Sequence, residues 1–262
     1  MDVAIVIPAR YNSRRLPGKP MVSVAGRSLL HRVVAIAQAV RGVGDVFVTT
    51  DDQRVAQHAA EAGVSVLMTS PECATGTDRV HAALSQMSKR PDAVINLQGD
   101  AVLTPPWVVQ GLVDAFHADP SVGMVTAAVH CSWRQVDEIE DLKRQSPTSG
   151  TLVTMDKFGR ALYFSKAVIP FLRKREGEMP PVHRHIGIYG YSADVLDELA
   201  TLPQSPLERA EQLEQLRALE NGIPIKVVVV DYRGRTHGSI DSPEDIPFVE
   251  AVIAREGELV AG

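Results

Sequence analysis

The chain has 262 residues, of which 45% are hydrophobic and 23% charged, an ordinary composition for a globular protein that buries a sizeable core. Its net charge of −5 and its aromatic content of only 5% argue against a nucleic-acid binder, which needs a basic surface and rings that stack on bases. No apolar run approaches the roughly 20 residues of a membrane span, and the start MDVAIVIP carries an acid at position 2, unlike a signal peptide. Cys73 and Cys131 lack the CxxC spacing of metal or redox sites. We therefore expect a cytoplasmic protein with reduced thiols and with no nucleic-acid or membrane partner.

Short apolar runs alternate with amphipathic segments over the first 130 residues. This pattern predicts strands over 3–7, 45–50, 64–69 and 93–98, separated by helices over 28–42, 51–63 and 77–88. Such alternation is typical of a parallel sheet covered by helices on both faces. Ligands of open parallel sheets bind beyond the carboxyl ends of the strands. The loop after the first strand and the residues after the fourth should therefore meet at the ligand-binding edge.

The second half reads differently. Strand-like stretches cover 122–129, 150–156, 160–165, 185–192 and 225–232, with a hairpin turn at 157–159. Ser205, Pro206 and Glu208 form a capping-box pattern that predicts one helix reaching about Glu220. A last helix should begin near Ser242. The charged, turn-rich run 138–181 is expected to leave the sheet as an excursion, and no linker divides the chain into separate domains.

The loop after the first strand, IPARYNSRRLPGKP, is strongly cationic. No acid occurs between Asp2 and Asp45, while this interval holds seven arginines and lysines: Arg10, Arg14, Arg15, Lys19, Arg27, Arg32 and Arg41. The loop is not a P-loop, because Pro20 follows Gly18-Lys19 and the upstream glycine is missing, and no GxGxxG fingerprint occurs. Arginine and lysine side chains should therefore hold several phosphate oxygens directly.

Seven segments in the same order resemble the CMP-Kdo synthetases (3-deoxy-manno-octulosonate cytidylyltransferases). They are IPARYNSRRLPGKP, TGTDRV, NLQGD, ALYFSKAVIP, HIGIYGY, SPLERAEQLEQLR and IDSPED. The resemblance covers nearly the whole chain. It implies an α/β fold in a single domain, 1–262, with a mostly parallel Rossmann-like nucleotide-binding sheet flanked by helices. The nucleotide-binding core would span about 1–130 and 185–262, and a smaller β-rich excursion, about 138–181, would serve acceptor binding and dimerisation.

The resemblance also implies an activity. Members of the family transfer CMP from CTP to an acidic keto-sugar and release pyrophosphate, with Mg²⁺ as cofactor, as homodimers, in lipopolysaccharide biosynthesis. Hard carboxylate ligands suit Mg²⁺. The partners expected here are therefore CTP and a small acidic acceptor, most like Kdo or a related keto-acid sugar.

Each matching motif assigns residues. Those expected to bind the nucleotide are Arg10, Ser13, Arg15, Lys19, Thr75, Gly76, Thr77, Arg79 and Gln98. Those expected at the acceptor are Gln98, His185, Tyr189, Glu214 and Gln215. Asp100 and Asp241 match the metal ligands, and with Arg15 and Lys19 they form the expected catalytic set. Several positions also have a purely structural interpretation. Arg14 would face solvent, and Thr77 or Asp241 would cap a helix, although Ser242 is a better cap than Asp241. His185 would support the structure without contacting a substrate.

Two departures from the family pattern leave the acceptor open. Ala101-Val102 follow Asp100 where the family has Glu-Pro, and SIDSPEDI replaces GVDTPEDL ahead of Pro247, which should cost the last helix one hydrogen bond. One alternative is therefore a CTP:phosphonoformate-type cytidylyltransferase that acts on a small phosphonate, in phosphonate biosynthesis. A second, from another class, is a catalytically inactive nucleotide-binding protein.

Overall fold

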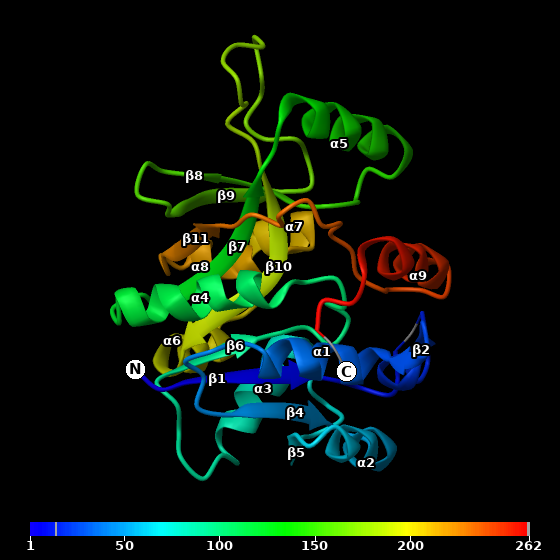
Figure 1. Ribbon diagram of the computed structural model, residues 1–262. Coiled ribbons are helices and arrows are strands. Elements are labelled where there is room, and N and C mark those ends of the chain that lie inside the picture. Colours follow the sequence, from blue (N-terminus) through cyan, green and yellow to red (C-terminus); the bar gives the residue numbers. More distant parts are fainter. Residues whose placement is uncertain (14, 261–262) are drawn as a thin grey trace.

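The computed structural model describes residues 1–13 and 15–260 (Figure 1), so Arg14 and its predicted exposure lie outside the described residues. Its strands are β1 (Val3–Pro8), β2 (Ser23–Val24), β3 (Arg27–Ser28), β4 (Val46–Thr50), β5 (Ser65–Met68), β6 (Ala93–Asn96), β7 (Met124–His130), β8 (Leu152–Met155), β9 (Ala161–Ser165), β10 (His183–Ser192) and β11 (Ile225–Val229). Its helices are η1 (Lys19–Met21), α1 (Leu29–Gln38), α2 (Gln53–Glu61), α3 (Gly76–Leu84), α4 (Pro106–Ala118), α5 (Trp133–Gln145), α6 (Ala193–Thr201), α7 (Pro206–Glu211), α8 (Gln215–Glu220) and α9 (Asp245–Glu256).

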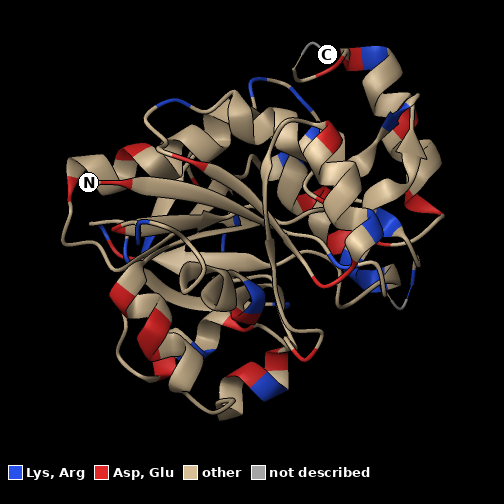
Figure 2. Ribbon diagram, turned by 90° about the horizontal axis from the view of Figure 1, so that it is seen from below, with Lys and Arg blue, Asp and Glu red and all other residues tan. Residues whose placement is uncertain are grey.

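One twisted sheet organises the molecule. Its strand order is β11-β7-β10-β6-β1-β4-β5, and the β8–β9 hairpin joins it through β10. In this row β10 runs antiparallel to both β6 and β7, whereas the other described pairs are parallel. The predicted mostly parallel α/β sheet is confirmed. Charged residues lie mainly on helices and loops, and the strands are largely uncharged (Figure 2).

Two hydrophobic layers cover the two faces of the sheet because strand residues alternate in direction. In β1, Val3, Ile5 and Ile7 belong to the layer under α1, α2, α4 and α9, while Ala4 and Val6 belong to the layer under α3, α6 and α8. In Figure 1, α5 and the β8–β9 hairpin lie at the far end of the molecule from β4 and β5. Both cysteines are free thiols. Among the described residues, none of the helices has the length and apolar character needed to cross a membrane.

The prediction of one helix from Ser205 to Glu220 is wrong. Ser205 and Glu208 do form the capping box, but α7 ends at Glu211. The next residue, Gln212, has a left-handed backbone (φ 55°), and α8 begins after it. A buried ion pair closes the break: Arg217 donates to both carboxylate oxygens of Glu208, at 2.8 and 2.5 Å. The pair fixes the direction of α8, which carries two of the predicted acceptor residues at its start.

The predicted cost of Pro247 to the last helix is also wrong. Helix α9 begins at Asp245, so Pro247 lies in its first turn. The N–H groups of the first turn have no partner inside a helix, and proline there removes no hydrogen bond.

Substitution of Gly190 tests how tightly β10 packs in the centre of the sheet. A Cβ at this position would lie 2.6–2.7 Å from Phe116, Ile95 and Val125 side-chain atoms. We expect Gly190→Ala to lower the free energy of unfolding by about 1–3 kcal/mol, the usual cost of overpacking, as measured by urea denaturation. Gly187→Ala, on the same strand with nothing within 4 Å, is the matched control. Equal stability of both variants would contradict this packing.

Candidate functional site

A cavity of about 360 Å³ lies at the carboxyl edge of the sheet, beyond β1 and β6. It is lined by ten of the eleven residues predicted to hold the nucleotide and the metal, all but Thr77: Arg10, Ser13, Arg15, Lys19, Thr75, Gly76, Arg79, Gln98, Asp100 and Asp241. Cys73 also lines it, and no feature of the sequence indicated that position. The topological expectation that these loops meet at one edge is confirmed.

Lys19 contacts both of the predicted metal-binding carboxylates in this cavity. Its ammonium donates to Asp100 Oδ2 at 2.6 Å and to Asp241 Oδ1 at 3.5 Å, while Arg15 donates to Asp241 Oδ1 at 2.8 Å. Lys19 and Asp100 side chains are mostly buried, at 14% and 28% exposure, whereas Arg15 remains 66% exposed. Two carboxylates from distant segments thus share one cationic centre.

Local backbone geometry fixes the cationic loop. The Tyr11 carbonyl accepts from the N–H groups of Ser13 and Gly18, which closes the loop on itself. Gly18 is left-handed (φ 71°) and approaches the Tyr11 ring, a place where a side chain would be strained. The chain then turns into η1, with Pro20 in its first turn, so the loop delivers Lys19 directly at a helix start.

The Asp241 carboxylate is free to enter the cavity because another residue organises its loop. Asp245 accepts from the backbone N–H groups of both Asp241 and Ser242, each at 2.8 Å. The N-cap of α9 is Glu244, so neither Asp241 nor Ser242 caps this helix. The alternative role predicted for Asp241 is therefore wrong.

Two glycines bring the remaining loops close together. A Cβ on Gly99 would lie 2.8 Å from the Pro8 carbonyl oxygen, so only glycine lets the ends of β1 and β6 approach this closely. A Cβ on Gly76 would lie 3.0 Å from the Gln98 side chain, which packs across it. Thr75, and not Thr77, caps α3, in a capping box with Asp78. Ala101 and Val102, by contrast, are buried in the hydrophobic core and do not line the cavity.

Arg79 is held in the cavity wall by residues that the sequence analysis did not single out. Its buried guanidinium donates to Thr69 Oγ1 at 2.8 Å and lies 3.5 Å from Asp51 Oδ1. The next residue, Asp52, caps α2 by accepting from the N–H of Arg54. The position of Asp51 at the carboxyl end of β4 was the signal that could have identified it.

A second, smaller cavity of about 190 Å³ adjoins the first, because Gly76 and Gln98 line both. Four further predicted residues line it: Thr77, Tyr189, Glu214 and Gln215. Burial raises the pKa of the Glu214 carboxyl above its usual range. The Nε2 of Gln215 is buried and has no hydrogen-bond partner among the described residues, so it is a donor that a bound molecule can satisfy.

His185 lines neither cavity. Its Nε2 lies 2.8 Å from Thr126 Oγ1, and its ring abuts Phe164 on one side and Tyr189 on the other. Burial lowers its pKa to about 3, helped by the positive charges of Lys166 and His237. The contact with an acceptor remains a prediction, and the observed contacts are those of a side chain that supports Tyr189.

Comparison with known proteins gives a consistent result. The family model described as cytidylyltransferase matches residues 4–227. The chain is 50% identical over 260 residues, 99% of its length and 100% of the relative, to a 3-deoxy-manno-octulosonate cytidylyltransferase of Maricaulis maris (strain MCS10). It is 39% identical over 97% of its length, and 99% of the relative, to an 8-amino-3,8-dideoxy-manno-octulosonate cytidylyltransferase of Shewanella piezotolerans (strain WP3 / JCM 13877). A solved structure of CMP:2-keto-3-deoxy-manno-octonic acid synthetase complexed with CTP superposes with a TM-score of 0.87 at 35% identity, covering 98% of this chain and 100% of that one.

The buried neutral His185 should make stability depend on pH. Its pKa is about 3 in the folded chain and about 6.5 when unfolded, so the unfolded state binds the extra proton between these values. The contribution of His185 to the free energy of unfolding is thus fully present above about pH 6.5. On acidification it falls by up to about 1.4 kcal/mol per pH unit. In urea titrations between pH 6 and 4, His185→Gln should flatten this slope, and replacing exposed His117 with Gln should not. An unchanged slope for His185→Gln would contradict its burial as the neutral form.

Proposed function

The chain belongs to the cytidylyltransferase family and is a nucleotidyltransferase, and from that premise we propose that it transfers CMP from CTP to 3-deoxy-manno-octulosonate (Kdo), releasing pyrophosphate. The observation that carries the proposal is the convergence of Lys19, Asp100 and Asp241 in a cation-lined cavity that adjoins a second one. A catalytically inactive binder would not need both carboxylates on that centre.

The first cavity suits a triphosphate. Four cationic side chains among the described residues line it, namely Arg10, Arg15, Lys19 and Arg79. Planar guanidinium groups can each bind two phosphate oxygens, and the lysine adds a compact charge. The exposed Arg15 is free to follow the ligand, whereas buried Arg79 is held in place by Thr69. We assign the triphosphate of CTP to this cavity, with Ser13 and Thr75 as further donors.

The residues also fit a divalent cation. Asp100 and Asp241 both approach the one ammonium of Lys19, so their oxygens already surround a positive charge. One or two carboxylates plus phosphate oxygens and water are the usual ligands of Mg²⁺ in nucleotide sites. When bound there, Mg²⁺ would supply charge that polarises the α-phosphate. With that charge supplied, Lys19 would be free to turn from the carboxylates toward the phosphates.

The residues themselves account for the rest of the chemistry by positioning and by charge. Lys19 and Arg15 neutralise the negative charge that develops on the departing pyrophosphate. Gln98 lies where the two cavities join and aligns the acceptor hydroxyl with the α-phosphorus. No side chain needs to form a covalent bond with the substrate.

The second cavity suits a sugar acid better than a small phosphonate. Tyr189, Glu214 and Gln215 offer hydroxyl, carboxyl and amide groups, and the described lining contains no lysine or arginine. A phosphonate carries more negative charge than Kdo and offers few hydroxyl groups to these partners. The higher identity to the Kdo relative, 50% against 39% for the 8-amino relative, favours Kdo over the amino sugar.

Pyrophosphate release tests the proposed reaction. With CTP and Mg²⁺, we expect turnover with Kdo, and much weaker turnover with the 8-amino analogue and with phosphonoformate. Turnover with phosphonoformate but not with Kdo would contradict the acceptor assignment. No release with any acceptor, while CTP binds, would indicate an inactive nucleotide-binding protein.

The two carboxylates should be needed for turnover but not for nucleotide binding. We expect Asp100→Asn and Asp241→Asn each to lower kcat by at least about 100-fold, the range typical of losing transition-state charge stabilisation. CTP binding in the absence of metal should persist in isothermal titration, since the cations remain. Asp114→Asn on α4, a surface residue away from both cavities, is the control. Near-normal turnover of both site variants would overturn the metal assignment.

We also propose that the chain forms a homodimer through the β8–β9 side. Phe158 and Leu162 on this hairpin are 59% and 62% exposed, and Phe171, in the loop that follows β9, is 87% exposed. Exposed large apolar side chains are common at protein–protein interfaces. In sedimentation equilibrium, Leu162→Glu should yield monomer, while Met68→Glu on the distant strand β5 should leave the dimer intact. A monomeric wild type would contradict the proposal.

A further inference from the structure

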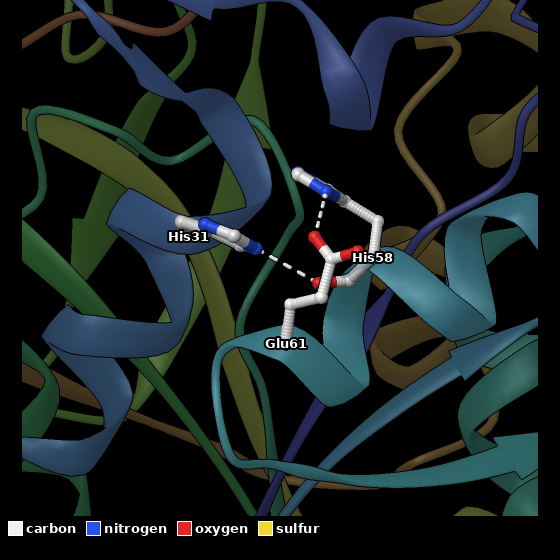
Figure 3. Close-up of side chains that lie close together, drawn as sticks. All are labelled: His31, His58 and Glu61. Carbon is white, nitrogen blue, oxygen red and sulfur yellow. Dashed lines mark hydrogen bonds and ion pairs between the residues drawn. The ribbon is translucent and has the colours of Figure 1, made fainter.

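A second cluster of metal-binding side chains lies away from both cavities. His31 projects from α1, and His58 and Glu61 project from α2, so that the three face one another across the two helices (Figure 3). Each offers one ligand atom, and these atoms lie within 4.8 Å of one another. None of the three lines the cavities assigned to CTP and the acceptor.

Hydrogen bonds of the ring nitrogens now hold the cluster, with donor and acceptor roles set by the tautomer of each ring. His58 Nδ1 lies 3.1 Å from Glu61 Oε2, and His58 Nε2 lies 2.7 Å from Ser28 Oγ. His31 Nε2 lies 2.8 Å from the carbonyl oxygen of His58. The Glu61 side chain is 57% exposed, so ions can reach the cluster from solvent.

We propose that His31, His58 and Glu61 form a binding site for one divalent transition-metal ion of the zinc type. Two imidazoles and one carboxylate are a ligand set that Zn²⁺ uses, with water in the fourth position. Imidazole nitrogen favours Zn²⁺, Ni²⁺, Cu²⁺ and Co²⁺ over Mg²⁺, which prefers oxygen. The site would therefore not compete for the ion held by Asp100 and Asp241.

Binding requires a small rearrangement. The rings of His31 and His58 stack at 4.0 Å with planes 11° apart, so one ion cannot lie in both ring planes as they stand. Turning the His58 ring breaks its contact with Ser28 and directs a nitrogen toward His31. Glu61, on the same face one helical turn later, follows because its side chain is exposed. The ion takes the position of the Nδ1 proton that faces Glu61, and in the neutral His58 ring that proton moves to Nε2.

An ion bound at this site would link α1 to α2, the two helices that support the cationic loop. Helix α2 packs against η1, which begins with Lys19, and Arg54 of α2 stacks over the Tyr11 ring at 3.5 Å. Helix α1 also packs against η1. Since an ion that binds only the folded chain stabilises it, Zn²⁺ should raise the melting temperature through these two helices.

Cobalt spectroscopy tests the site without reference to activity. After treatment with a chelator, the wild-type chain should bind Co²⁺ with the visible absorption of a four-coordinate nitrogen and oxygen site. His31→Gln and Glu61→Gln should each weaken Co²⁺ binding at least about tenfold and abolish the rise in melting temperature with Zn²⁺. Asp100→Asn should keep the absorption, which separates this site from the nucleotide cavity.

The pair His130 and His183 provides a matched control. Their rings also stack, at 4.6 Å, but no third ligand completes a cluster among the described residues. His130→Gln should leave Co²⁺ binding unchanged. Absence of the absorption in the wild type, or its persistence in both His31→Gln and Glu61→Gln, would overturn the proposal. Because Glu61 lies at the surface, its replacement tests the site even if His31→Gln folds poorly.

Discussion

The shared ammonium of Lys19 is the contact on which the rest of the candidate site depends. Asp100 and Asp241 lie 81 and 222 positions away from Lys19 along the chain, yet both carboxylates reach it. Two neighbouring carboxylates repel each other, and the ammonium of Lys19 offsets that repulsion. The exposed pair Arg15–Asp241 adds little stability, as surface ion pairs usually do. The arrangement of Lys19, Asp100 and Asp241 is therefore better explained by the ligands that it can bind than by a contribution to the stability of the fold.

Parallel strands make this convergence possible. Strands β1 and β6 are neighbours and end at the same edge, so the cationic loop and Asp100 emerge side by side. Gly99 then lets the two ends approach each other, and Gly18 lets the loop turn back on Tyr11. Asp241 arrives from the other end of the chain, held by Asp245 at the start of α9. Packing of α9 against the same hydrophobic layer as α1 thus determines whether the second carboxylate is present.

Much of this was predictable from the sequence because it depends on local patterns. Apolar runs predicted β1, β4, β5 and β6, and all the residues assigned through the resemblance except His185 line at least one of the two cavities. Features that depend on distant contacts were not predictable. No glycine beside Gln212 indicates the break between α7 and α8 in the sequence. The break depends instead on the ion pair of Glu208 with Arg217. The support of Arg79 by Asp51, and the meeting of His31 with His58, likewise arise only when separate elements pack together.

The measurement that tests the central claim most directly is a crystal structure with CTP and Mn²⁺, in which anomalous scattering locates the ion. The account predicts the ion on the carboxylates of Asp100 and Asp241, with Lys19 and Arg15 on phosphate oxygens. An ion located elsewhere, or a triphosphate bound away from the cationic loop while Lys19 still pairs with both aspartates, would contradict it.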